Sequence, residues 1–214
     1  MIEDIRGAAS GFGVRWTVLC GLGLAGGLAV GLGLAAPVEA VVGMMLVTPV
    51  ILALAGSMFG AAQWLALGRS PQLGASWVGT SGIGLGIGMT IGIVLVEMLG
   101  QALTGEPMRL QALDMLGRLG GLTFVGAFAG LGLGAAQWLA LRPAAPIARR
   151  WIVLCVAGFG AGLPAGSLAA ELVGGLQSAV GFAAFLGVAG LTLGVFTARG
   201  GAAIAAGLAP RRAD

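Results

Sequence analysis

The 214-residue chain contains no histidine, no lysine and no tyrosine, and only 9% of its residues are charged. Without histidine there is no imidazole base, no histidine metal ligand and no histidine axial ligand for a haem or a chlorophyll. A phosphate-binding loop of the Walker type needs a lysine and is excluded. The two cysteines, Cys20 and Cys155, are too few for a disulfide framework and have no companions for a metal site.

These absences exclude several classes of function. No serine, threonine or cysteine has a general base beside it in the sequence, and the glycine-x-glycine patterns lack the context of a dinucleotide site. We therefore expect no catalytic residues and no metal site, and we predict that the protein is not an enzyme. The basic residues are all arginines at the edges of apolar segments, so we expect no nucleic-acid partner.

Apolar sequence is abundant, at 58% hydrophobic residues and a mean hydropathy of +1.02. Crossing a hydrocarbon core of about 30 Å takes roughly 20 helical residues. Six apolar runs are long enough, near residues 14–36, 46–67, 76–99, 119–141, 150–171 and 179–199. The sequence predicts an all-α polytopic membrane protein with six transmembrane helices in a lipid bilayer.

An internal repeat organises these spans. Residues 60–67 read Gly-Ala-Ala-Gln-Trp-Leu-Ala-Leu and recur letter for letter at 134–141, in the second and fourth spans. Trp16, Trp77 and Trp151 open the first, third and fifth spans. The chain is therefore predicted to be one transmembrane domain of three tandem helical hairpins, near 14–70, 75–143 and 149–200. Each hairpin inserts the same way up, so we hypothesise a pseudo-threefold axis along the membrane normal.

The charges predict an orientation. Nine of the eleven arginines lie at the amino terminus, the carboxyl tail and the loops on their side of the membrane. By the positive-inside rule, both termini are expected to be cytoplasmic, in a bacterial inner membrane. All five tryptophans fall on this edge, which predicts a one-sided aromatic belt. On the other side, residues 101–118 form either an extracytoplasmic loop or a short interfacial helix.

Glycine is the most unusual component, with 42 residues. In lipid there is little hydrophobic drive between helices, so small residues that let backbones approach supply the packing. Rows four residues apart predict such glycine-zipper packing, above all Gly84, Gly88, Gly92, Gly126, Gly130 and Gly134. The third span carries a second row opposite the first, so it is expected to be sandwiched. Its neighbours are two helices, or one helix and a flat apolar ligand such as a lipid, quinone or carotenoid.

Two sets of polar residues are candidate sites. Gln63 and Gln137 lie deep in their spans beside Trp64 and Trp138. An unpaired buried amide is costly, so each glutamine either bonds a neighbouring helix or a lipid headgroup, or contacts a ligand or cofactor, such as the magnesium of a chlorophyll.

Three acids mark the opposite ends of the odd-numbered spans, namely Glu39, Glu97 and Glu171. They either form a ring at the mouth of a cation pathway or simply mark the non-cytoplasmic helix ends.

The ending Gln-Trp-Leu-Ala-Leu, followed by Arg69 after one extra glycine and directly by Arg142, resembles a Gln-Trp-Leu-x-Leu-Arg signature of uncharacterised bacterial multi-pass membrane proteins. That resemblance implies membership and no activity. The sequence favours a non-catalytic accessory or scaffolding subunit that packs against other membrane protein subunits. One form of this hypothesis is that the subunit also holds lipid or pigment. The alternative is a small channel or transporter along the pseudo-threefold axis. A transporter needs a polar cavity at mid-membrane, whereas a packing subunit has a dry centre.

Overall fold

A computed structural model describes residues 2–105, 110, 113–142 and 148–208. Across these residues the chain forms seven helices: α1 (Ile2–Gly33), α2 (Ala35–Val42), α3 (Met44–Ala66), α4 (Gly74–Thr104), α5 (Met115–Leu141), α6 (Ala148–Leu172) and α7 (Ala179–Leu208).

The predicted all-α membrane fold is confirmed. In the described part of the chain, six helices are long and apolar enough to cross a bilayer, spanning Gly11–Gly33, Leu46–Ala66, Gly74–Leu103, Met115–Leu141, Arg149–Leu172 and Ala179–Leu208. Each overlaps one of the predicted runs. The third and sixth spans, on α4 and α7, continue beyond residues 99 and 199, where the predicted apolar runs end.

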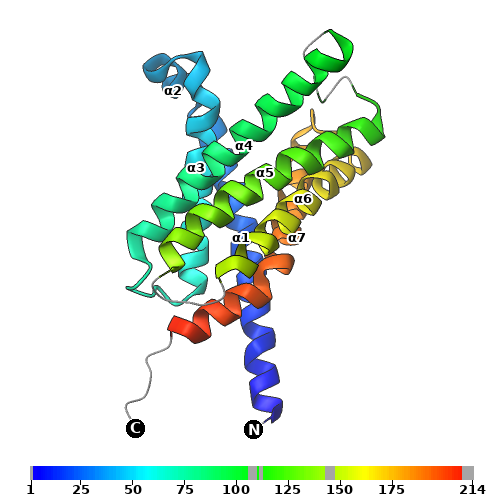
Figure 1. Ribbon diagram of the computed structural model, residues 1–214. Helices are drawn as coiled ribbons and strands as arrows, with labels where there is room; N and C mark the ends of the chain where they lie inside the picture. Colours follow the sequence, from blue (N-terminus) through cyan, green and yellow to red (C-terminus); the bar gives the residue numbers. More distant parts are fainter. Residues whose placement is uncertain (1, 106–109, 111–112, 143–147, 209–214) are drawn as a thin grey trace.

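The six long helices close into a ring. Along the chain, α1 packs on α3, α3 on α4, α4 on α5, α5 on α6 and α6 on α7, and α7 packs back against α1. Figure 1 shows that α1 begins and α7 ends at the same end of the bundle, while α2 lies at the other end. This order is that of three hairpins, α1–α3, α4–α5 and α6–α7, arranged about a central axis.

The helix ends have identifiable caps. The carboxylate of Asp114 accepts a hydrogen bond from the Gly117 amide at 2.7 Å, which satisfies one of the free N–H groups at the start of α5. Helix α4 ends at Gly105, whose φ of 78° lies in the left-handed region that glycine adopts without steric cost. The Arg15 guanidinium of α1 donates to the Leu65 carbonyl in the last turn of α3.

Helix α4 approaches α5 too closely for any side chain larger than hydrogen. A Cβ built on Gly84 would lie 2.6 Å from the carbonyl oxygen of Gly132. A Cβ on Gly88 would collide with the carbonyl oxygen of Phe128, and Gly92 faces the same helix. Backbone contact of this kind is how small residues hold helices together in lipid.

The glycines of α5 face the next helix in the ring. A Cβ on Gly134 would lie 2.9 Å from Cα of Ile152, and on Gly126 or Gly130 it would collide with a carbonyl oxygen of α6. The six glycines singled out for packing therefore lie at the α4–α5 and α5–α6 interfaces. The other four interfaces also bury a glycine, pairing Gly23 with Ala62 (α1–α3), Gly60 with Ser81 (α3–α4), Gly158 with Leu193 (α6–α7) and Gly194 with Thr17 (α7–α1).

The second glycine row of α4 faces α3. A Cβ on Gly82 would lie 2.7 Å from the carbonyl oxygen of Ala53, and one on Gly86 would lie 3.0 Å from that of Pro49. Of the two alternatives for this sandwiched helix, the structure shows two helix neighbours.

The first span differs from the expectation. Helix α1 ends at Gly33, and the separate short helix α2 follows. Pro37 has no N–H to bond the carbonyl of Gly33, four residues earlier, and its ring crowds that carbonyl. The helix therefore breaks at Leu34, before the proline. Glu39 therefore lies on α2, which packs on α3 and α1, and the prediction that it ends the first span is wrong.

The segment between α4 and α5 is shorter than the predicted 101–118. Helix α4 reaches Thr104 and α5 begins at Met115. Six of the eighteen residues of the predicted extracytoplasmic loop or interfacial helix, 106–109 and 111–112, fall outside the described residues.

The α4–α5 contact gives a test of the glycine packing. Gly88→Ala is expected to lower the free energy of unfolding by about 1–3 kcal/mol, the usual cost of overpacking, because α4 must move away from the Phe128 carbonyl. Gly187→Ala is the matched control, since a Cβ there meets nothing within 4 Å. Because alanine has a better helix propensity than glycine, this substitution should stabilise α7 by up to about 1 kcal/mol. Reversible unfolding in mixed detergent micelles measures both, and equal stabilities would contradict the packing.

Candidate functional site

Three tryptophans lie together at the centre of the ring. Trp16, Trp77 and Trp151 are each 0% exposed. The Trp151 ring meets Trp16 edge-on, with centroids 6.0 Å apart, and lies 6.1 Å from the Trp77 ring. The predicted aromatic belt is therefore wrong for these three residues. The position of a tryptophan near a span end predicts its depth in the membrane, but it does not predict whether the side chain faces lipid or the bundle interior.

Two of these indoles donate to the polar residue of a neighbouring helix. Trp16 Nε1 donates to Thr197 Oγ1 on α7 at 3.0 Å, and Trp151 Nε1 donates to Gln137 Oε1 on α5 at 2.9 Å. In both pairs the indole of one hairpin reaches the second helix of the hairpin before it around the ring. Buried indoles usually find such a partner.

Gln137 connects four helices. Its amide nitrogen donates to Gln63 Oε1 on α3 and to Ser81 Oγ on α4, each at 2.7 Å, while its oxygen accepts from Trp151 on α6. Both glutamines and Ser81 are 0% exposed. Of the two alternatives for the glutamines, the structure shows the hydrogen bond between helices. Both amide hydrogens of Gln137 are used on protein acceptors.

The third tryptophan breaks the pattern. By the same pattern, Trp77 on α4 would donate to Gln63 on α3. The Gln63 oxygen instead accepts a hydrogen bond from Gln137. Trp77 Nε1 and Gln63 Nε2 are therefore buried without an acceptor among the described residues. An unsatisfied buried donor costs about 1–3 kcal/mol. These two unsatisfied donors lie next to Gln137, which makes three hydrogen bonds in the cluster.

Trp64 and Trp138 lie apart from this cluster, because adjacent residues on a helix point about 100° apart. Both are half-buried. Trp64 Nε1 donates to the Ser70 carbonyl at 2.9 Å, and the Arg142 guanidinium lies 5.3 Å from the Trp138 ring centroid. These two tryptophans hold the helix ends on the arginine-rich side, and the structure does not bring them to the buried amides of Gln63 and Gln137.

On the other side of the tryptophans the axis is apolar. An enclosed cavity of about 30 Å³ lies between Leu24, Leu28, Leu52, Leu85, Met89, Phe159, Leu163, Phe185, Leu186 and Ala189. A water needs two to four polar partners, and apolar cavities stay dry. Among the described residues, this lining offers none.

The three acids of the predicted pathway mouth are carried by α2, α4 and α6, whereas the main packing partners of these helices are α3 for α2, α3 and α5 for α4, and α5 and α7 for α6. Glu39 and Glu97 are exposed. Glu171 Oε1 pairs with Arg118 Nη2 of α5 at 3.1 Å. The ion pair gives Glu171 a local structural role between α5 and α6.

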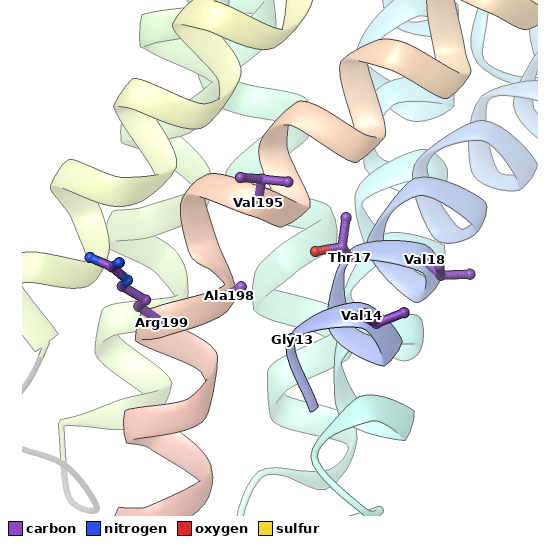
Figure 2. Close-up of a pocket in the computed structure, with 7 residues that line it drawn as sticks. All are labelled: Gly13, Val14, Thr17, Val18, Val195, Ala198 and Arg199. Atoms are coloured by element: carbon purple, nitrogen blue, oxygen red, sulfur yellow. The ribbon is translucent and has the colours of Figure 1, made fainter. Parts of the chain in front are cut away.

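Two open grooves lie on the outside of the ring, near the arginine-rich end. One holds about 490 Å³ between α3 and α4, lined by Trp64, Gly74, Ala75, Val78 and Gly79. The other holds about 390 Å³ between α7 and α1 (Figure 2) and is lined by Gly13, Val14, Thr17, Val18, Val195, Ala198 and Arg199. The four positions from α1 and the four from α4 correspond at the 61-residue spacing of Trp16 and Trp77. The grooves are therefore repeats of one feature, but only the α7–α1 groove includes a cation.

Two residues of the central cluster escaped the sequence interpretation. Thr197 takes the place of the glutamines in the sixth span, 60 residues after Gln137, as Gly194 follows Gly134 by 60. Ser81 stands where Cys20 and Cys155 stand in the other odd-numbered spans. The repeat spacing was the available signal for both residues.

The cluster consists of neutral donors and acceptors, and in the described chain no three acidic, histidine or cysteine side chains gather as a metal site. Networks of this kind hold helices in register. No protein family, curated protein or solved structure matches this chain. Function must therefore be argued from the geometry alone.

Thr197 and Thr192 form a matched pair for testing the cluster. Each hydroxyl donates to the carbonyl four residues earlier in α7 at 2.8 Å, but only Thr197 also accepts from Trp16. Thr197→Val should destabilise the protein by about 1 kcal/mol, within the range for hydrogen bonds between membrane helices. Thr192→Val should stay within about 0.5 kcal/mol of the unchanged protein. Unfolding in micelles, followed by tryptophan fluorescence, measures both free energies of unfolding. Equal effects of the two substitutions would show that the hydrogen bond from Trp16 adds no stability.

Proposed function

We propose that the protein is a non-catalytic accessory or scaffolding subunit, which packs against other membrane proteins through the outside of its helix ring. The filled axis carries this proposal. Trp16, Trp77 and Trp151 occupy its arginine-rich half, and the cavity beyond them is small and apolar. The inside of the ring is thus used for its own packing, which leaves the outer surface for interaction.

Features of the outer surface support a protein partner. Ile83, Ile87 and Ile91 form a row along α4 and are 61%, 56% and 45% exposed. A Cβ added to Gly79 or Gly187 would meet nothing within 4 Å, so at these places the backbone is accessible. Apolar ridges beside accessible small residues suit close approach by a further transmembrane helix.

The alternative of a channel or transporter along the axis has weaker support. Such proteins bind their substrate near the bilayer midplane, commonly with polar or ionisable groups. Here the amides of Gln63 and Gln137 bond each other, and Glu171 pairs with Arg118. A cation would meet only apolar side chains in the cavity below the tryptophans.

The proposed setting is a bacterial inner membrane with both ends of the chain in the cytoplasm. The arginine distribution supports this orientation, since Arg15, Arg69, Arg142 and Arg199 lie at the end of the bundle where α1 begins and α7 ends.

Purification from the native membrane tests the proposal. In a mild detergent, the tagged protein should migrate with at least one other membrane protein at fixed stoichiometry, identified by mass spectrometry. An absorption spectrum of the same fraction reports any bound pigment. The matched control is the same preparation in a harsh detergent, in which the partner should dissociate.

A protein that migrates alone and conducts ions in liposomes would contradict the proposal and favour the alternative. In that case Glu97→Gln and Glu171→Gln should each reduce the flux. Under the proposal, the unchanged protein gives no flux above empty liposomes.

A further inference from the structure

We infer that the groove between α7 and α1 binds one anionic phospholipid, with an acyl chain along the groove and the phosphate on Arg199. This inference does not rest on the proposed function, because it concerns the binding of a lipid and not of a protein partner.

The groove is polar at one end and apolar at the other. Helix α1 runs away from the arginine-rich end from Gly13 to Val18, whereas α7 runs towards it from Val195 to Arg199. Arg199 and Gly13 therefore lie at the end nearest the membrane surface, and Val18 and Val195 lie about one turn deeper. An amphiphile oriented along the membrane normal has this same polarity.

The walls of the groove suit an acyl chain. Val18 and Val195 are 45% and 64% exposed in the described chain, and both lie within candidate membrane spans. The half-buried Thr17 hydroxyl points towards α7 in Figure 2, between the charged and the apolar ends. A hydroxyl at this depth can donate to a lipid ester carbonyl. The volume of about 390 Å³ is in the range of small-ligand sites.

The charge at the rim selects the headgroup. Arg199 is exposed, and no carboxylate pairs with it among the side chains that the structure describes. Arg199 is among the residues that line the groove, and Figure 2 shows its side chain extended from the flank of α7 on the side away from α1. Guanidinium binds phosphate bidentately and strongly. An anionic phospholipid satisfies both the cation and the apolar wall, whereas a soluble anion satisfies only the first.

The α3–α4 groove provides an internal control. Its α4 side is formed by the four residues that correspond to the α1 side of the α7–α1 groove. On α3, however, Leu65 occupies the repeat position that Arg199 occupies on α7, 134 residues later. It should therefore accept an acyl chain without preferring an anionic headgroup. The comparison separates the charge of Arg199 from the shape that both grooves share.

The experiment is native mass spectrometry of the full-length protein, titrated with phosphatidylglycerol or phosphatidylcholine of identical chains. One cation near a membrane surface contributes about 1 kcal/mol to anionic lipid binding, so the unchanged protein should prefer phosphatidylglycerol about fivefold at one site. Arg199→Gln should abolish the preference and Arg199→Lys should retain most of it. Gly13→Leu, which meets no neighbour at Cβ, should block the site for both lipids.

The controls exclude diffuse attraction and loss of folding. Arg69→Gln removes the same charge at the same end and should leave the preference intact. Gly79→Leu fills the α3–α4 groove, where a Cβ also meets nothing, and should remove one lipid without changing the selectivity. Size-exclusion profiles should match across all the variants. Excess glycerol phosphate should not displace the lipid.

The inference is overturned if Arg199→Gln keeps the preference or if Arg69→Gln loses it equally. It is also overturned if Gly13→Leu still binds phosphatidylglycerol as the unchanged protein does. Displacement by glycerol phosphate would assign Arg199 to a soluble anion instead of a lipid.

Discussion

Helices in a bilayer are held together mainly by close packing and hydrogen bonds, because lipid removes most of the hydrophobic drive between them. In this protein, close approach depends on glycine at all six interfaces of the described ring. Contact of this kind also makes the ring narrow. Side chains that point inward then meet at the axis, where Trp151 contacts Trp16 and Trp77. The same glycines thus account for the closed ring and for its filled centre.

The inward side chains form two layers of different chemistry. Towards the arginine-rich end, three tryptophans lie together. Trp16 donates to the Thr197 hydroxyl and Trp151 to the Gln137 amide, which in turn donates to Gln63. Beyond them the lining is leucine, methionine and phenylalanine. A polar network is directional, so it fixes how the hairpins are rotated against one another, which apolar packing alone specifies poorly. In the described part of the chain, the Nε donors of Trp77 and Gln63 have no acceptor, which is the energetic cost of this arrangement.

Much of the fold could be predicted from the sequence, because apolar length and glycine spacing are local signals. The spans, the order of the helices and the use of Gly84 or Gly130 in packing follow from them. The direction in which a residue faces does not, since Trp16 at a span end suits a lipid interface and a bundle interior equally well. The predicted first run, 14–36, stops just before Pro37, but the break between α1 and α2 at Leu34 was not predicted. Sequence also showed Gln63 and Gln137 as candidates, whereas their meeting required the closed ring.

The central claim is that the axis is closed and dry, and the two native cysteines test it directly. Cys20 and Cys155 lie inside the ring, four residues after Trp16 and Trp151, and both are 0% exposed. A charged, membrane-impermeant thiol reagent applied to either side of native vesicles should label neither cysteine until the protein is denatured. A cysteine introduced at exposed Arg69 should label at once from one side. Labelling of Cys20 or Cys155 in the folded protein would show a water-filled path along the axis and would contradict this account.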